Sequence, residues 1–563
     1  MCGISGILFN LQASTLINKM VQAQTHRGPD VANTYCSKNN EHALGHNRLS
    51  IIDLSEHGNQ PMFSPDKRYV MVFNGEVYNY RELKTALQHS YSFTSQTDSE
   101  VVLAAWIIWG PECLQKMIGM FSFAIWDTQQ QTLFAARDRF GVKPFYYHLS
   151  DTSLYFASEI KTLWAAGIPK TKNDKVWANY FSHGSYGLPH ETFWKGVQQL
   201  PAGYCLTYDA ASGVHTRQWY SFTQRVQTLI DKQEDSITEQ YEALLRESIR
   251  LRFRADVPVG FNLSGGVDSS TLLALVNQCY PNAPIEAYTF YTGDERYDEL
   301  PWVQTMIQQT NNPLIACKFS VHDVPSMITA VSIAQDEPFG GIPTLAYANL
   351  FKEARNRGTK VLLDGQGMDE AWAGYDYYHN NNNQTIQGIT QSPYAPHILE
   401  DEFRTLATPE QYPAPFSCPM MNLQFRDLFY TKIPRALRFN DRISMMFSTE
   451  LREPFLDHRL VELAFSRPKE EKWHNGNTKW FLRNLVSKYL GDTISYAPKR
   501  ALQTPQREWL SGALKEMVLA HLQTVDTSGY FKKGEVFKQY QTFCANPVQS
   551  VNIWQYVNFA LLL

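Results

Sequence analysis

The sequence lacks the features that would place it outside ordinary globular proteins. Its eight cysteines are scattered without any Cys-x-x-Cys pair, which argues against a zinc site or a dense disulfide framework and favours a reducing compartment. Lys and Arg number 51 against 55 Asp and Glu, a formal net charge of −4, so there is no basic excess for nucleic acid. The longest apolar stretches, such as 101–110, are far too short to span a bilayer.

The N-terminus also lacks the basic segment and apolar core of a signal peptide. Together these absences predict a cytoplasmic protein that binds neither nucleic acid nor membrane. At 563 residues the chain exceeds what one hydrophobic core supports, so two or more domains are expected. We predict a first domain at 2–210, a linker at 211–235 and a second domain at 236–563.

The two predicted domains differ in their sequence pattern. The first is rich in strands, turns and a few helices, which indicates an α+β fold with antiparallel sheet. A helix is predicted over 99–110, with Asp98 or Ser99 as its N-cap. In the second domain short apolar strands alternate with helices, which is typical of βαβ units and a parallel sheet.

One segment of the second domain has the pattern of a phosphate-binding turn. The string VGFNLSGGVDSSTLL (259–273) is an apolar strand, a turn with two glycines, and a helix. The backbone N–H groups of Ser264, Gly265 and Gly266 can converge on an anion, and the helix that begins near Ser269 adds its positive end. It is not a Walker A loop, because no Gly-Lys-Ser/Thr follows. Two glycines alone would fit a plain strand–helix turn equally well.

The complete string SGGVDSS resembles the PP-loop of ATP pyrophosphatases, which cleave ATP to AMP and pyrophosphate. Asp268 within it is an acid beside phosphates, a common place for a Mg²⁺ ligand. A second acidic turn, LLDGQGMDE (362–370), follows another strand. Because ligands bind beyond the carboxyl ends of parallel strands, we expect Asp369 to face the same nucleotide. Read alone, Asp369 and Glu370 would be ordinary helix-start acids.

The chain opens with MCGISGI, which places a cysteine at position 2. If Met1 is removed, Cys2 carries both a thiol and a free α-amine, whose pKa is roughly 7.7–8.0 in model peptides. One residue would then supply a nucleophile and a base suited to cellular pH. From its position alone, Cys2 would be regarded as incidental.

The rest of the first domain changes that interpretation. HRGPD (26–30), HNRLSIID (46–53), FNGEVYN (73–79), TDSE (97–100) and RDRFGVKPFYY (137–147) follow in order. This set resembles the class II glutamine amidotransferase domain, an N-terminal-nucleophile fold. With the PP-loop and the segment 437–465, nearly the whole chain resembles the glutamine-hydrolysing asparagine synthetase family. The resemblance implies an αββα sandwich, then a doubly wound parallel-sheet domain of the adenine nucleotide α-hydrolase type with helical additions.

The resemblance also assigns roles in the first domain. Cys2 would attack the glutamine amide carbon to give a thioester and ammonia, with the Asn74 side chain and the Gly75 N–H as the oxyanion hole. Such donors are typically worth about 10²–10³-fold each. The planar fork of Arg48 suits the α-carboxylate of glutamine. The other residues expected around glutamine are Leu49, Ser50, Ile51, Ile52, Glu76 and Asp98, the two acids holding its α-ammonium.

For the second domain the resemblance implies ATP and Mg²⁺. ATP would adenylate the aspartate carboxylate, and ammonia arriving through an internal tunnel would give asparagine, AMP and diphosphate. The expected nucleotide contacts are Leu263, Ser264, Gly265, Gly266, Asp268, Ser269, Thr292, Asp364 and Gly365, with Asp268 and Asp369 as metal ligands. Gln366 and Lys499 occupy positions with catalytic roles in the family. Homodimers are common in the family.

Two departures from the family pattern concern the acceptor. The usual Ser-Gly-Glu-Gly-Ser-Asp-Glu string reads DGQGMDE here, so Gln366 stands where an acid is associated with aspartyl-adenylate formation. Glutamine can form hydrogen bonds but cannot act as a base. The tail motif Arg-x-Lys-x-Gly-Phe is also altered, with Ala497, Lys499, Ala501 and Leu502 at its defined positions.

These departures leave several functions open. The acceptor is aspartate, or a sugar acid, peptide or other secondary-metabolite carboxylate. Cys2 and its complete pocket argue against the related β-lactam synthetases. The PP-loop argues against phosphoribosyl and glucosamine phosphate amidotransferases, which share only the first domain. A regulatory protein with inactive sites is the remaining alternative.

Overall fold

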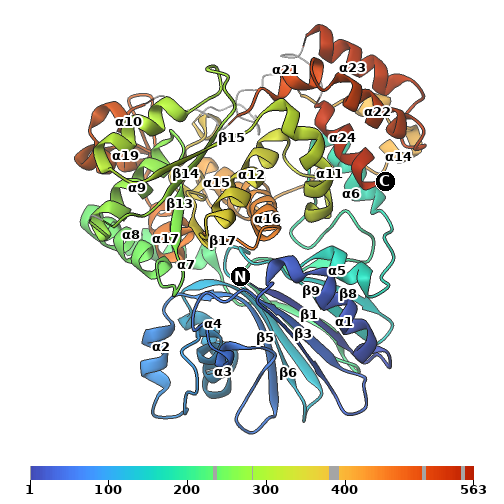
Figure 1. Ribbon diagram of the computed structural model, residues 1–563, viewed down its shortest axis with the longest axis vertical. Helices are drawn as coiled ribbons and strands as arrows, with labels where there is room; N and C mark the ends of the chain where they lie inside the picture. Colours follow the sequence, from blue (N-terminus) through green and yellow to red (C-terminus); the bar gives the residue numbers. More distant parts are fainter. Residues whose placement is uncertain (1, 233–236, 282, 380–391, 498–502, 547–551) are drawn as a thin grey trace.

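The computed structural model describes residues 2–232, 237–281, 283–379, 392–497, 503–546 and 552–563. Within these ranges, two stacked antiparallel sheets are followed by one parallel sheet with helices on both sides (Figure 1). The predicted fold class is therefore confirmed: an αββα sandwich, then a doubly wound parallel-sheet domain with helical additions.

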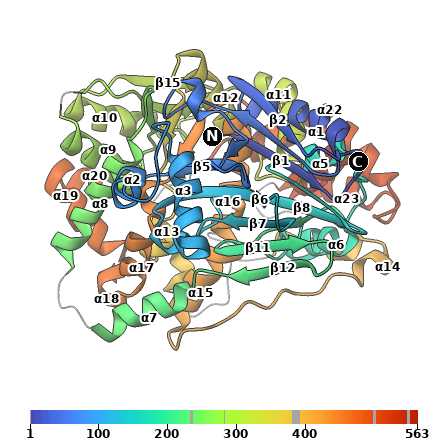
Figure 2. The same ribbon diagram turned by 90° about the horizontal axis from the view of Figure 1, so that it is seen from below.

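The sandwich consists of two sheets that are six-stranded in the described residues. The first has the order β10-β8-β9-β1-β3-β2, with β1 (Gly3–Leu8), β2 (Val31–Cys36), β3 (Ala43–Arg48), β8 (Tyr146–Ser150), β9 (Ser153–Ala157) and β10 (Gln198–Gln199). The second has the order β12-β11-β7-β6-β5-β4, with β4 (Met62–Phe63), β5 (Tyr69–Val77), β6 (Gly119–Asp127), β7 (Thr132–Arg137), β11 (Tyr204–Asp209) and β12 (Gly213–Gln218). Figure 2 shows β6, β7, β11 and β12 side by side.

Helices cover the outer faces of the sandwich. They are α1 (Ala13–Ala23) and α5 (Ile160–Ala165) beside the first sheet, and α2 (Tyr80–Leu87), α3 (Asp98–Trp109) and α4 (Cys113–Lys116) beside the second (Figure 1). The helix α6 (Asp174–His183) lies away from the sheets, next to the C-terminal helix (Figure 1). In α1 the buried residues Ala13, Ile17, Met20 and Val21 recur with helical spacing, so one apolar stripe faces the sheet. The helix predicted from 99 begins at Asp98, and Thr97 is its N-cap, because the Thr97 hydroxyl accepts the Glu100 N–H at 3.2 Å.

The parallel sheet has the order β15-β14-β13-β16-β17 in the described residues, with β13 (Val259–Asn262), β14 (Ala287–Tyr291), β15 (Leu314–Lys318), β16 (Val361–Leu363) and β17 (Glu450–Arg452). One face carries α8 (Thr238–Arg252), α9 (Val267–Cys279), α10 (Leu300–Thr310) and α19 (Trp480–Leu490). The other carries α11 (Val324–Gln335), α12 (Ile342–Asn356) and α16 (Lys432–Met445). The edge strand β17 lies nearest the sandwich (Figure 1).

The remaining helices complete the second half. They are α7 (Phe222–Lys232), α13 (Met368–Ala371), α14 (Asp401–Arg404), α15 (Pro419–Phe429), α17 (His458–Phe465), α18 (Lys469–Lys472), α20 (Asp492–Ser495), α21 (Gln506–Ser511), α22 (Lys515–Asp526), α23 (Glu535–Ala545) and α24 (Ile553–Leu562). In the part of the chain that the structure describes, no helix has both the length and the apolar character needed to cross a membrane. The β11–β12 hairpin extends the second sheet to Gln218, past residue 210; the division into domains stays a prediction.

The two halves share a buried interface that combines charged and aromatic contacts. The Arg27 guanidinium binds the Asp441 carboxylate at 2.8 Å, and both side chains are buried. The Trp177 ring of α6 packs against Phe559 of α24, with ring centroids 4.9 Å apart. The C-terminal helix α24 therefore contacts α6 of the first half as well as α11 of the second.

Asp441→Asn tests whether the interface ion pair stabilises the whole molecule. Removing one partner of a buried pair typically costs about 3–5 kcal/mol, because the other charge is left uncompensated. Since Glu159 also binds Arg27 at 2.8 Å, we expect about 3 kcal/mol, the lower end of that range. The measurement is the urea midpoint followed by tryptophan fluorescence. The control is Glu535→Gln, which removes the ion pair of Glu535 with Lys538 on the surface. A loss of unfolding free energy in Glu535→Gln equal to that in Asp441→Asn would contradict the prediction.

Candidate functional site

Cys2 lies directly before β1 and is 9% exposed. Its backbone N–H donates a hydrogen bond to the Asn74 side-chain oxygen on β5, 3.0 Å away. Its carbonyl oxygen accepts from the Arg27 guanidinium at 3.1 Å. The backbone of Cys2 is therefore held from both sides, once by the opposite sheet and once by the arginine that reaches the second half.

The environment of the Cys2 thiol favours its neutral form. Burial raises the pKa of the thiol, and the charge of Glu450 acts in the same direction. A backbone hydrogen bond from Leu49 and the charge of Arg48 act against this rise. A neutral buried thiol requires a base close by before it becomes a nucleophile.

Asn74 and Gly75 lie at the middle of β5, next to Cys2. Asn74 is fully buried; its Oδ1 accepts from Cys2, but its Nδ2 has no hydrogen-bond partner among the described residues. Gly75 has φ +154°, and a Cβ there would lie 2.2 Å from the Met120 carbonyl oxygen, so only glycine fits. A buried amide donor without an acceptor is costly, and an oxyanion at this place would satisfy it.

Arg48 ends β3, and the loop that follows holds its guanidinium. Nη1 donates to the Ser55 carbonyl at 2.6 Å and to the Asn59 side chain at 3.0 Å, and Nη2 donates to the Asp53 carbonyl. Of the next residues, Leu49, Ile51 and Ile52 are buried and Ser50 is half-buried. The structure thus brings the predicted segment 48–52 to Cys2 with its arginine held in one orientation.

Glu76 and Asp98 form a buried acidic pair on β5 and α3. The Asp98 carboxylate accepts the Val77 N–H at 2.8 Å. Burial raises the pKa of Asp98 to about 6, and burial together with the charge of Asp98 raises the pKa of Glu76. Arg452 of β17 reaches Glu76 at 3.2 Å, while Glu76 Oε2 has no hydrogen-bond partner among the described residues. A cationic group would stabilise this pair.

The predicted phosphate turn follows β13 directly, and Gly266 is the N-cap of α9. The Ser264 and Ser269 hydroxyls lie 3.0 Å apart at the mouth of the helix. The Gly265 N–H donates to the Glu299 carboxylate at 3.1 Å, so a carboxylate oxygen takes the place expected for a phosphate oxygen. The turn therefore has the anion-binding geometry that the sequence predicts.

Other predicted nucleotide residues surround this turn. The Leu263 N–H donates to the Tyr288 carbonyl at 2.8 Å, and the Thr292 N–H donates to the Asp298 carboxylate at 2.7 Å. A Cβ at Gly365 would lie 3.5 Å from that of Asp268, so the turns after β13 and β16 are in contact. The two strands, β13 and β16, are parallel hydrogen-bonded neighbours in the sheet.

A lysine that the sequence analysis did not identify connects the two acidic turns. The Lys479 ammonium lies 2.7 and 2.6 Å from the Asp268 carboxylate oxygens and 2.7 Å from Asp369. Burial lowers the pKa of Lys479, but the two carboxylates outweigh this effect and raise it. Lys479 precedes α19 and lies more than 100 positions from either acid, so only the tertiary structure reveals it. Lys499, the predicted lysine, lies outside the described residues.

The two carboxylates fit a Mg²⁺ site completed by substrate. Asp268 and Asp369 converge on one cation, Lys479, and Mg²⁺ is usually bound by one or two carboxylates together with substrate phosphates. Within the described ranges no group of three or more His, Cys, Asp or Glu could hold a metal by itself. The donor set therefore suits a metal that enters with a nucleotide.

Gln366 lies in the turn after β16 and is half-buried. Its side chain donates a hydrogen bond to the Asp364 carboxylate, which also accepts the Gly365 N–H at 2.8 Å. Asp364 is thus the one carboxylate of the DGQG turn. It is 5% exposed, and burial raises its pKa.

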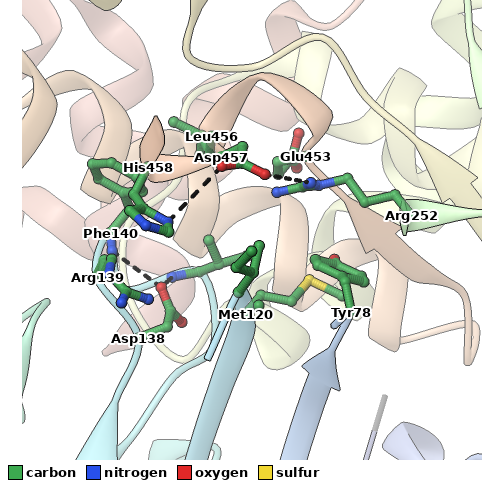
Figure 3. A pocket seen from close by; sticks show the side chains of 13 residues that line it. Tyr78, Met120, Asp138, Arg139, Phe140, Arg252, Glu453, Leu456, Asp457 and His458 are labelled. Atoms are coloured by element: carbon green, nitrogen blue, oxygen red, sulfur yellow. Dashed lines mark hydrogen bonds and ion pairs between the residues drawn. The ribbon is translucent and has the colours of Figure 1, made fainter. Parts of the chain in front are cut away.

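A pocket lies between the two halves (Figure 3). Tyr78 and Met120 come from the sandwich, and Arg252, Glu453 and His458 come from the second half. Met120 is the residue whose carbonyl abuts Gly75, so the pocket begins beside the strand that carries Asn74. Its other end is lined by the turn that follows β17.

Comparison with known proteins identifies both halves. Residues 1–220 match the glutamine amidotransferase domain and residues 240–563 match asparagine synthase. The asparagine synthetase [glutamine-hydrolyzing] 3 of Bacillus subtilis is 29% identical over 539 aligned positions, covering 89% of this chain and 86% of that protein. Asparagine synthetase [glutamine-hydrolyzing] 1 of the same organism is 27% identical, with coverages of 100% and 96%. Amidase chry2 of Gibberella zeae is 25% identical, with coverages of 92% and 91%.

The first half is thus a glutamine amidotransferase domain, in agreement with its sandwich fold and with the cysteine at the start of β1. The chain as a whole belongs to the asparagine synthase family. It is a glutamine-hydrolysing carbon–nitrogen ligase, and the family uses ATP.

Proposed function

We propose that the protein hydrolyses glutamine at Cys2 and passes ammonia to the acyl-adenylate of aspartate, giving asparagine, AMP, diphosphate and glutamate. The observation that carries this proposal is the buried, unsatisfied Asn74 amide beside Cys2. It supplies a donor for an oxyanion next to a nucleophile, which a regulatory protein with inactive sites would not need.

In the first half, the Cys2 sulfur attacks the amide carbon of glutamine, and the carbon–nitrogen bond then breaks to release ammonia. The α-amine of Cys2, exposed once Met1 is removed, takes the thiol proton and returns it to the leaving nitrogen. Asn74 Nδ2 and the Gly75 N–H stabilise the oxyanion. Water then cleaves the thioester to give glutamate.

The glutamine backbone is held as a zwitterion between two opposite charges. Arg48 binds the α-carboxylate, and its fixed contacts to the following loop orient the guanidinium. Glu76 and Asp98 bind the α-ammonium, which supplies the positive charge that this buried pair lacks. The segment of Leu49, Ser50, Ile51 and Ile52 forms the wall between the two ends.

In the second half, the turn of Ser264, Gly265, Gly266 and Ser269 holds the pyrophosphate end of ATP, with Leu263, Thr292, Asp364 and Gly365 around the nucleotide. Asp268 and Asp369 would hold Mg²⁺, which neutralises phosphate charge when bound. Lys479 then directs its charge to the phosphates, because the metal takes over its carboxylates. Lys499 is assigned the same task in the family and stays a prediction here.

A different acceptor is the second candidate function. Gln366 stands where the family has an acid, and its side chain is bound to Asp364 rather than to an ammonium. A relative of similar coverage is called an amidase. The alternative is the same chemistry on a sugar acid, peptide or secondary-metabolite carboxylate.

The decisive test measures pyrophosphate release from ATP and glutamine with each acceptor in turn. We expect release that depends on aspartate and is matched by AMP and asparagine. Release that depends on another carboxylate, with none for aspartate, would establish the alternative acceptor. If none of the tested acceptors gave pyrophosphate release, and glutamine gave no glutamate, the enzyme function itself would be contradicted.

Cys2→Ala separates the two half-reactions. Without the thiol no thioester forms, so glutamine-dependent synthesis should fall to background while synthesis from ammonium salts continues. Retaining Met1, or adding a tag before Cys2, should have the same effect because the α-amine is blocked. The matched control is Cys36→Ala, an exposed cysteine in the same half. Normal glutamate release by a tagged protein would refute the role of the α-amine.

Asp98→Asn tests the ammonium end of the glutamine pocket. Because the pKa of Asp98 is about 6, its carboxylate is charged above pH 6 and protonated below it, so the KM for glutamine in the wild type should rise as pH falls through 6. In Asp98→Asn we expect a KM raised about 10–100-fold, the loss of one charge-assisted hydrogen bond. The rise around pH 6 should also disappear. Asp209→Asn, in an exposed turn, is the control; an unchanged KM in Asp98→Asn would rule out this assignment.

A further inference from the structure

Glu453 is a buried carboxyl group that lies between the two sites. It follows β17, is 3% exposed, and lines the pocket opposite Tyr78 and Met120 (Figure 3). It accepts a hydrogen bond from the backbone N–H of Gln366. Its Oε2 is buried and has no hydrogen-bond partner among the described residues. The Glu453 carboxyl group thus faces the turn that lacks the family acid, and one of its oxygens is buried without a hydrogen-bond partner among the described residues.

The other acids near this turn are already committed to protein groups. Asp364 accepts from Gly365 at 2.8 Å and from Asn440 at 3.4 Å. Glu299 accepts from Gly265 at 3.1 Å, and Glu370 accepts from the Tyr375 hydroxyl at 2.9 Å. Glu453, in contrast, both interacts with the backbone of Gln366 and lines the pocket between the two halves.

We propose that Glu453 is the general base of amide formation in this protein, supplying from the turn after β17 the carboxylate that Gln366 cannot supply. The proposal rests on the function proposed above and adds a residue to it. It holds for aspartate and for any other adenylated carboxylate, because the reacting nitrogen is the same.

Ammonia attacks the acyl carbon of the adenylate, forming a carbon–nitrogen bond and leaving a positive charge on nitrogen. Glu453 accepts one proton from that nitrogen, and the carbon–oxygen bond to AMP breaks with its electron pair on the phosphate oxygen. The products are the amide, AMP and a protonated Glu453, which returns its proton to solvent.

The surroundings of Glu453 suit this task. Burial raises the pKa of Glu453, and the charge of Asp364 raises it further, while Lys143 and Arg252 oppose the rise. A base is most effective when its pKa approaches the working pH. Met120, whose carbonyl oxygen abuts Gly75, lines the same pocket as Glu453, so this pocket lies between the strand of Asn74 and Glu453.

Four variants test the proposal: Glu453→Gln, Glu453→Asp, Gln366→Glu combined with Glu453→Gln, and the control Glu462→Gln. Glu462 is a buried acid in the same segment whose carboxylate accepts from the Tyr220 hydroxyl at 2.7 Å. Each is assayed with ATP, glutamine and aspartate, or the best acceptor of the wild type, for amide, pyrophosphate and glutamate.

We expect Glu453→Gln to lower the rate of amide formation about 10²–10⁴-fold, the usual contribution of a general base. Pyrophosphate and glutamate formed per amide should rise, because adenylation and glutamine hydrolysis precede the affected step. The double variant should recover at least part of the loss by restoring a carboxylate at position 366. Glu462→Gln should match the wild type.

The outcomes separate this inference from the proposed function. A wild type that forms no amide with any acceptor overturns both. An active wild type, with Glu453→Gln equal to Glu462→Gln, overturns the role of Glu453 alone. If Glu453→Gln also stops hydrolysing glutamine and unfolds at a lower urea concentration than the wild type, the rate of amide formation in Glu453→Asp decides whether the carboxylate is needed. Retained amide formation in that variant supports the carboxylate, and a loss equal to that of Glu453→Gln refutes it.

Discussion

The whole arrangement depends on one buried edge strand, β17. Its Arg452 is fully buried and binds Glu450 at 2.6 Å, the Arg252 carbonyl at 2.7 Å and Glu76 at 3.2 Å. An arginine in such a place is stable only if each side of the guanidinium meets an acceptor. The parallel sheet and the sandwich therefore cannot separate here without breaking the buried contact between Arg452 and Glu76.

The same strand explains why the two sites face one another. Ligands of a parallel sheet bind beyond the carboxyl ends of its strands, and the chain that leaves β17 at its carboxyl end is the turn with Glu453. Lys143 of the sandwich reaches the Leu451 carbonyl of β17 at 3.4 Å. The edge that closes the nucleotide domain is thus also the wall of the pocket that begins beside Gly75.

Local patterns were sufficient to predict the antiparallel sheet of the first half, the parallel sheet and the phosphate turn, because each depends on short strings such as SGGVDSS and on the period of apolar residues. The sandwich arrangement was expected from the family resemblance. Residues that the family resemblance assigns to a glutamine site, including Cys2 and Asn74, do lie together in the structure, and their binding of glutamine stays a prediction. Lys479 and Glu453 were not predicted. Their partners lie on distant strands, and a single lysine before a helix or a glutamate before Pro-Phe-Leu carries no local signal of its neighbours. The cap of α3 was misplaced because Thr97, Asp98 and Ser99 are all good caps.

Lys479 has a consequence for how a nucleotide enters. Two carboxylates that converge without a cation repel one another by about 4 kcal/mol at 4 Å near a protein surface, and the ammonium of Lys479 removes that repulsion. In the free protein, Lys479 therefore offsets one of the two negative charges of Asp268 and Asp369. If a divalent ion enters with ATP as proposed, it has to compete with the Lys479 ammonium for the two carboxylates, so its affinity would depend on an exchange between cations.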